Sequence, residues 1–135
     1  MYVYVDKITE NDVNVIMNLD EIIFGKEMST YPQNYISEIC NQKMGFIVIA
    51  EDIPVGYVIY DRCLNEISNQ WPITIMSIGV LPEYQGNGLG RSLLKSVLEL
   101  YPNENIYLKV NVKNYVAQNL YTSVGFVTIG EIPNY

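Results

Sequence analysis

The chain has 135 residues, of which 49% are hydrophobic, and a formal net charge of -7. This length and composition predict a single domain over residues 1–135 with one hydrophobic core. The charge balance argues against a nucleic-acid partner, because only 8 Lys and Arg are present and phosphate binding needs a clustered basic surface. An acidic surface favours cationic partners instead.

The sequence shows no signal for a membrane or a metal. No stretch approaches the roughly 18 apolar residues of a membrane span, and the N-terminus lacks a basic region followed by an apolar one, so we expect a cytoplasmic protein with no membrane partner. Cys40 and Cys63 lie far apart with no histidine to join them, which predicts neither a metal site nor a disulfide. Without histidine, acid and base chemistry would come from Tyr, carboxylates, Lys or water.

The first elements have clear local signals. A β-prone run at residues 2–5 predicts a strand, and residues 9–12 (TEND) offer a capping box to apolar residues at helical spacing over 13–23. Pro32, in a first-turn position, begins a second short helix that runs to about residue 39. Two helices therefore precede the main part of the sheet.

Three apolar runs predict the next strands. Residues 46–50 and 55–60 flank a turn-rich linker of the length that a hairpin uses, which predicts an antiparallel pair. Residues 73–80 form a further strand, in which Gly79 indicates a bulge or a close backbone approach.

The last third alternates helix and strand. After a glycine loop, the pattern predicts a helix over 92–100, a strand over 106–112, a helix over 115–123 with Gly125 past its end, and a strand over 126–129. Hairpins followed by β-α-β units predict a mixed sheet with helices on both faces, a fold of α/β or mixed α+β class.

The glycine loop is the candidate ligand-binding site of the sequence. Gly86, Gly88 and Gly90 lie between a strand and an amphipathic helix, where backbone N–H groups can converge on an anion at the positive end of the helix dipole. A dinucleotide fingerprint would need glycine where Arg91 stands, and a Walker loop would need Lys before Ser or Thr. Both are disfavoured, and a connection that merely turns the chain is the remaining alternative.

Two motifs resemble one known family. Residues 80–91 (VLPEYQGNGLGR) resemble the Q/R-x-x-G-x-G/A motif of GNAT acetyltransferases, and residues 114–126 (NYVAQNLYTSVGF) resemble the family's N-x-x-A-x-x-L-Y-x-x-x-G-F motif. The resemblance covers nearly all of the chain. It implies the GNAT fold, a mixed and mostly antiparallel sheet of about six strands with about four helices, whose final strand is missing because the chain stops at Tyr135.

The resemblance also implies acetyl-CoA as cosubstrate, with no metal. Backbone groups of Ile78 and Val80 would lie against the pantetheine arm, inserted between strands that the Gly79 bulge splays apart. Asn114 would hydrogen-bond the cofactor, and Tyr121 would lie near its sulfur, where a phenol with a pKa of about 10 suits protonation of a leaving thiolate. A core aromatic is the alternative for Tyr121. The amides around the pyrophosphate would be those of Gln85, Gly86, Asn87, Gly88, Leu89, Gly90 and Arg91.

The closer similarity is to the N-terminal acetyltransferase branch, especially its NatE type, and to the ribosomal-protein alanine acetyltransferases. Residues 31–35 (YPQNY) look like the F-P-x-x-Y segment of that branch, which implies a protein or peptide N-terminus as the amine acceptor. Ordinary packing is the alternative for these residues. The implied peptide pocket is lined by Tyr31, Pro32, Tyr35, Met76 and Tyr135.

The chain departs from that branch at the positions that matter for a base. Thr74 stands where the branch has tyrosine, and Lys109 stands where it has histidine or glutamate. No evident general base remains, because lysine is cationic unless strongly buried. An α-amine of pKa about 8 is already roughly a tenth neutral at pH 7, so water relayed by Thr74 or Ser77 would suffice.

Two other functions stay open beside transfer to a peptide α-amine. The acidic charge and the missing peptide-site residues favour a small amine, such as a polyamine or an aminoglycoside, as acceptor. The absent base and the early end at Tyr135 favour a non-catalytic acyl-CoA-binding module. The same early end predicts an open sheet edge, at which a second copy of the chain would pair as a homodimer.

Overall fold

The computed structural model describes residues 1–26, 31–66 and 68–131. In this part of the chain the strands are β1 (Val3–Lys7), β2 (Gly45–Ala50), β3 (Ile53–Arg62), β4 (Ile73–Val80) and β5 (Ile106–Tyr107). The α-helices are α1 (Val13–Phe24), α2 (Gln33–Asn41), α3 (Leu89–Leu100) and α4 (Tyr115–Ser123). Two short 3-10 turns, Glu10–Asp12 and Pro82–Tyr84, precede α1 and α3. None of the helices in these ranges is long and apolar enough to cross a membrane.

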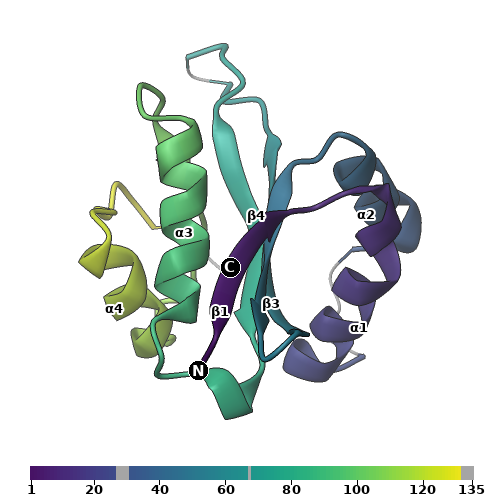
Figure 1. Cartoon of the computed structure of the whole chain (residues 1–135). Coiled ribbons are helices and arrows are strands. Elements are labelled where there is room, and N and C mark those ends of the chain that lie inside the picture. The colour runs from purple at the N-terminus through teal and green to yellow at the C-terminus, as the bar shows by residue number, and fades with distance from the viewer. Residues whose placement is uncertain (27–30, 67, 132–135) are drawn as a thin grey trace.

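The strands form one mixed sheet in the order β1-β2-β3-β4-β5. The first four strands are antiparallel to their neighbours, and β5 runs parallel to β4. Helices α1 and α2 lie on one face of the sheet, and α3 and α4 lie on the other (Figure 1). The expected mixed fold with helices on both faces is therefore confirmed.

Each face of the sheet has its own hydrophobic cluster. Side chains of β3 alternate between the two clusters, as the period of a strand requires: Val58 and Tyr60 face α3, while Tyr57 and Ile59 face α1 and α2. All four side chains are almost completely buried. The central strand is thus covered on both sides, which fixes its register and the register of β4 beside it.

Helix α1 begins as its sequence predicts. Thr9 caps the preceding 3-10 turn, and the Asp12 carboxylate accepts a hydrogen bond of 2.8 Å from the Thr9 backbone N–H, which completes a capping box. The buried face of the helix contains Ile16 and Leu19 together with the acidic Asp20. Ile22, expected in the apolar face, is exposed instead.

The sheet has fewer strands than expected, and its last strand, β5, is shorter than expected. Five strands form in the described residues instead of about six, because residues 126–129 are not a strand, and β5 ends at Tyr107 instead of continuing to residue 112. Val127 and Ile129 are each 79% exposed. Strand propensity is realised only where a neighbouring strand supplies a hydrogen-bond ladder and packing, and neither segment has such a neighbour among the described strands.

Gly56 fills a position of close contact between the central strands. A Cβ placed there would lie 2.8 Å from the Gly79 carbonyl oxygen and 2.9 Å from Val48 Cγ1. We expect Gly56→Ala to lower the free energy of unfolding by about 1–3 kcal/mol through this overpacking, measured by urea denaturation. Gly130→Ala is the matched control, because nothing lies within 4 Å of its added Cβ. Equal midpoints for the two variants would contradict this packing.

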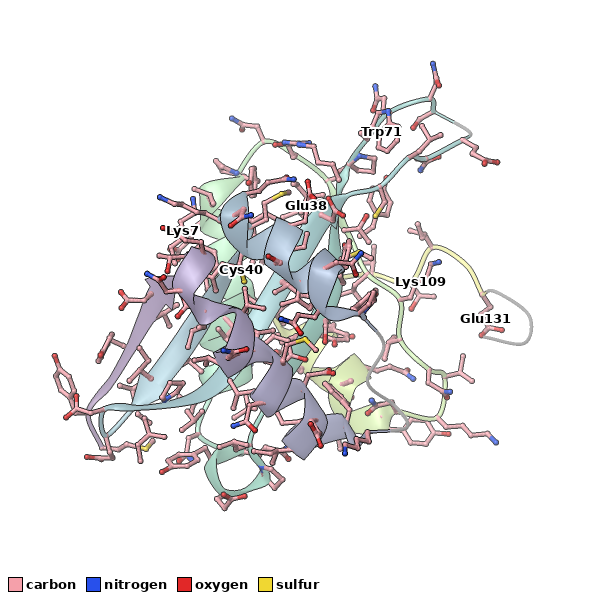
Figure 2. The ribbon with its side chains drawn as sticks, turned by 90° about the vertical axis from the view of Figure 1, so that its right-hand side faces the viewer. Lys7, Glu38, Cys40, Trp71, Lys109 and Glu131 are labelled. Atoms are coloured by element: carbon pink, nitrogen blue, oxygen red, sulfur yellow. The ribbon has the colours of Figure 1, made fainter. Side chains whose placement is uncertain are left out.

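Cys40 lies in the last turn of α2 and is fully buried (Figure 2). Burial, with a smaller contribution from Asp12, raises the pKa of its thiol to about 11. Because the thiolate is the reactive form, we expect iodoacetamide at pH 8 to alkylate Cys63 in the folded protein and to spare Cys40. Peptide mass mapping checks this, with the urea-unfolded protein as the control in which both react. Equal rates in the folded protein would contradict the burial of Cys40.

Candidate active site

The glycine loop joins β4 to α3 and leaves the start of that helix uncapped. Gly86 and Gly88 have φ angles of 82° and 76°, a left-handed conformation that suits glycine. Gly88 is the N-cap of α3 and supplies no side-chain hydrogen bond. The first N–H groups of a helix have no intrahelical acceptor and lie at the positive end of its dipole. This exposed start of α3, beside Arg91, has the geometry of an anion site.

The side chains of the loop brace it from within. Gln85 Nε2 donates a hydrogen bond of 3.0 Å to the Val80 carbonyl oxygen, and Asn87 Nδ2 donates one of 3.1 Å to the Tyr84 carbonyl oxygen. At Gly90, glycine is favoured by close packing, because a Cβ there would lie 3.2 Å from Leu120 Cδ2 of α4. The third glycine of the motif thus allows α3 and α4 to approach each other.

A β-bulge interrupts β4, and it lies at Met76. Ile59 of β3 pairs with Ser77 and the next residue, Tyr60, pairs with Ile75, so Met76 has no partner. The prediction that Gly79 forms the bulge is wrong. Gly79 is instead a position of close packing against side chains of α1, since a Cβ there would lie 3.1 Å from Ile23 Cδ1.

Beyond the bulge, β4 presents an open edge. The β4–β5 pairing covers only Ile73 with Ile106 and Thr74 with Tyr107, so the two strands separate after Thr74, as expected of a splayed pair. The remainder of β4 has no strand beside it on that side among the described residues.

The open edge exposes backbone groups of alternate residues. Leu81 N–H donates to the Val55 carbonyl oxygen of β3 over 2.8 Å. Because the direction of hydrogen bonding alternates along a strand, Ser77 and Gly79 also turn their backbone groups towards β3. Ile78 and Val80 therefore turn theirs to the open edge, where the Val80 carbonyl already accepts from Gln85.

Three of the five residues expected at a peptide pocket, Tyr31, Tyr35 and Met76, lie together at the bulge. Tyr31 Oη donates to the Met76 carbonyl oxygen over 3.3 Å, and its ring centroid lies 5.0 Å from that of Tyr35. Tyr35 Oη donates to Asp61 Oδ2 over 2.7 Å. Burial above all, and then this carboxylate, raise the pKa of Tyr35 above its ordinary value. Pro32 is exposed at the start of α2.

Tyr135, the fifth residue expected in that pocket, lies outside the described residues.

A buried polar chain lies next to these tyrosines. Tyr57 Oη donates to Asp20 Oδ1 over 3.0 Å and lies 2.7 Å from Ser77 Oγ. Burial raises the pKa of Tyr57 above its ordinary value, the Ser77 hydrogen bond lowers it in part, and Asp20 raises it further. The phenol therefore stays protonated. Sequence reasoning missed this chain; the available signal was that Asp20 follows Ile16 by four residues and so shares its buried helical face.

Helix α4 and its N-cap contain the two predicted site residues of the second motif, Asn114 and Tyr121. Asn114 is its N-cap, because Oδ1 accepts a hydrogen bond of 3.1 Å from the Ala117 N–H. Tyr121 is half-buried, and its ring centroid lies 6.0 Å from that of Phe126 in an edge-on arrangement. Lys109 is exposed on the segment after β5 (Figure 2).

No cluster of metal-ligating side chains accompanies these residues. Across residues 1–26, 31–66 and 68–131, no three His, Cys, Asp or Glu side chains come close enough together to hold a metal ion.

Together, the uncapped helix start and the open edge of β4 have the geometry of a site for an extended ligand that carries a phosphate group. The family model described as Acetyltransferase (GNAT) family matches residues 13–126. The chain belongs to this family.

Individual relatives agree with that assignment. An N-alpha-acetyltransferase of Sulfurisphaera tokodaii is 38% identical, over 89% of this chain and 81% of its own length. The structure of Arabidopsis thaliana Naa50 in complex with the bisubstrate analogue CoA-Ac-MVNAL is 27% identical with a TM-score of 0.83, over 100% of this chain and 89% of that one. The N-alpha-acetyltransferase RimI of Mycobacterium tuberculosis is 45% identical over a matched region that covers 42% of this chain and 35% of the length of that relative. The predicted family, fold and enzyme class, an acetyl-CoA-dependent N-acetyltransferase, are confirmed.

Proposed function

We propose that the protein transfers an acetyl group from acetyl-CoA to the α-amine of a protein or peptide N-terminus. The hydrogen bond from Tyr31 to the Met76 carbonyl carries this proposal, because it fixes an aromatic residue of the α1–α2 segment against the bulge beside the open edge of β4. An aromatic wall at that place suits an apolar first side chain. The Naa50 complex, whose bisubstrate analogue contains the sequence MVNAL, supports a peptide that begins with Met.

The open edge and the helix start fit acetyl-CoA as the cosubstrate. Backbone groups of Ile78 and Val80 would lie along its pantetheine arm, like those of an added strand. Since Asn114 Oδ1 is used by the helix cap, Asn114 would contact the cosubstrate through its amide nitrogen. The pyrophosphate would be held by the backbone amides from Gln85 to Arg91.

Acetyl transfer would then occur by direct attack. The neutral amine forms a bond to the thioester carbonyl carbon while the carbon–sulfur bond breaks, and the amine gives up one proton to water. Tyr121 gives its phenolic proton to the departing thiolate and is reprotonated from solvent. Backbone N–H groups near Ile78 would polarise the carbonyl oxygen.

A small polycationic amine is the second candidate acceptor. Two carboxylates, Asp20 and Asp61, lie within one hydrogen bond of the pocket tyrosines Tyr57 and Tyr35, and carboxylates favour a cationic ligand.

A CoA-release assay distinguishes the two acceptors. We expect turnover with peptides that begin with Met and no turnover with their N-acetylated forms. Faster turnover with spermidine than with any peptide would favour the small amine. Binding of acetyl-CoA without release of CoA from any amine would contradict both and favour a non-catalytic module.

The single-domain organisation over residues 1–135, the cytoplasmic location, and the homodimer through an open sheet edge stay predictions.

A further inference from the structure

Three side chains from three elements form a buried hydrogen-bonded chain on the α1–α2 face of the sheet. Asp20 comes from α1, Tyr57 from β3 and Ser77 from β4. The Tyr57 hydroxyl lies 3.0 Å from Asp20 Oδ1 and 2.7 Å from Ser77 Oγ. Asp20 is only 9% exposed and Tyr57 only 1%, so the chain is held in one arrangement by the core around it.

The chemistry of these groups fixes the direction of both hydrogen bonds. A carboxylate only accepts hydrogen bonds, and a phenol has one hydrogen to donate. If Tyr57 donated to Ser77, two acceptor oxygens would face each other across the 3.0 Å between Tyr57 and Asp20. Tyr57 therefore donates to Asp20, and Ser77 must donate its single hydrogen to Tyr57. Towards any further group, Ser77 Oγ can act only as an acceptor.

Ser77 lies where an acceptor amine would have to approach. It directly precedes Ile78, whose backbone faces the open edge of β4, and it follows Met76, to which Tyr31 is hydrogen-bonded. Ser77, Tyr31 and Asp20 line one small cavity between α1 and the sheet. Its volume of about 10 Å³ is at the lower limit for one water molecule, so the cavity has room for no more than one small polar group.

We propose that Asp20 and Tyr57 act as positioning residues that hold Ser77 as a pure hydrogen-bond acceptor, and that Ser77 Oγ accepts an N–H of the acceptor amine. This inference rests on the proposed transfer to an amine. An amine with one N–H held in this way directs its lone pair along a fixed line towards the thioester carbonyl, which is an orientation effect. The arrangement needs no histidine and no tyrosine at the place of Thr74.

The kinetic test uses Tyr57→Phe, Ser77→Ala and the double variant. Without the Tyr57 oxygen, the Ser77 hydrogen is free to turn into the pocket, where it opposes an incoming N–H. We expect each single variant to lower kcat/KM for a Met-starting peptide about tenfold, with the KM for acetyl-CoA unchanged. Because both act through one hydrogen bond, the double variant should be no worse than either single one. Additive losses would overturn the proposal.

Tyr60→Phe is the matched control. Tyr60 is a buried tyrosine of the same strand, its side chain faces α3, and its hydroxyl accepts a hydrogen bond of 3.1 Å from Tyr101. Tyr60→Phe should lower thermal stability about as much as Tyr57→Phe but leave kcat/KM for the peptide unchanged. The same loss of kcat/KM in both variants would show that Tyr57 has only a structural role.

A binding measurement separates this inference from the proposed function. Calorimetry in the presence of CoA compares a Met-starting peptide with its des-amino analogue. We expect the wild type to bind the amine peptide about tenfold tighter, and Ser77→Ala to lose this preference. If the wild type transfers the acetyl group and Ser77→Ala still binds the amine peptide more tightly than the des-amino analogue, the inference alone is overturned. A preference that depends on Ser77, without transfer, would overturn the proposed function alone, and the absence of both would overturn the two together.

Discussion

Replacing Tyr121 by phenylalanine is expected to lower kcat about a hundredfold, the lower end of the range for loss of a general acid. The ring is half-buried against Phe126, so the variant keeps its packing and loses only the hydroxyl. The dissociation constant for acetyl-CoA should not change, because the proton is needed only as the carbon–sulfur bond breaks. Single-turnover kinetics and calorimetry together measure both quantities.

Tyr115→Phe serves as the control for Tyr121→Phe. Tyr115 belongs to the same helix and is 69% exposed, so the loss of its hydroxyl should change neither kcat nor affinity. An unchanged kcat in Tyr121→Phe would assign Tyr121 to the core alone and leave the thiolate to be protonated by water.

The second large effect is expected at the start of α3. Arg91→Glu replaces a cation by an anion in the first turn of the helix, next to the backbone amides proposed for the pyrophosphate. The new carboxylate would repel the phosphate groups of the cosubstrate and would offset the partial positive charge by which the helix start favours anions. We therefore expect the dissociation constant for acetyl-CoA to rise about 10- to 100-fold. The effect should weaken as salt is added. Fluorescence or calorimetric titration measures it.

Lys95→Glu makes the same charge change one turn further along the same exposed face. Its effect on the affinity for acetyl-CoA should be small, because the influence of a helix terminus falls off within the first turn. Equal losses in the two variants would mean that the net charge of the protein, and not the start of α3, controls binding.

The sequence predicts best what is encoded within a few residues. The capping box from Thr9 to Asp12 and the proline before α2 mark where helices begin, and Gly86 and Gly88 mark the left-handed turns of the loop before α3. Each of these signals depends on the local backbone, so no knowledge of the neighbouring elements is needed. Helix α3 begins at Leu89, three residues earlier than predicted, because Gly88 already serves as its N-cap.

Features that depend on distant partners could not be predicted in the same way. The bulge at Met76 follows from the register between β3 and β4, which only the packed sheet defines. The segment 126–129 has strand propensity but finds no ladder. The chain from Asp20 to Ser77 joins residues that are 57 positions apart in sequence, with Tyr57 between them. Helical spacing relative to Ile16 was an available signal that Asp20 lies on the buried face of α1, but its hydrogen-bond partner was set by tertiary structure.

The most direct test of the account is to locate the transferred acetyl group. A peptide that begins with Met and contains an internal lysine offers two amines to the enzyme in one molecule. After incubation with acetyl-CoA, tandem mass spectrometry should find one acetyl group, on the N-terminal α-amine. An acetyl group on the lysine side chain alone, or an unmodified peptide from protein that binds acetyl-CoA, would contradict transfer to a peptide N-terminus.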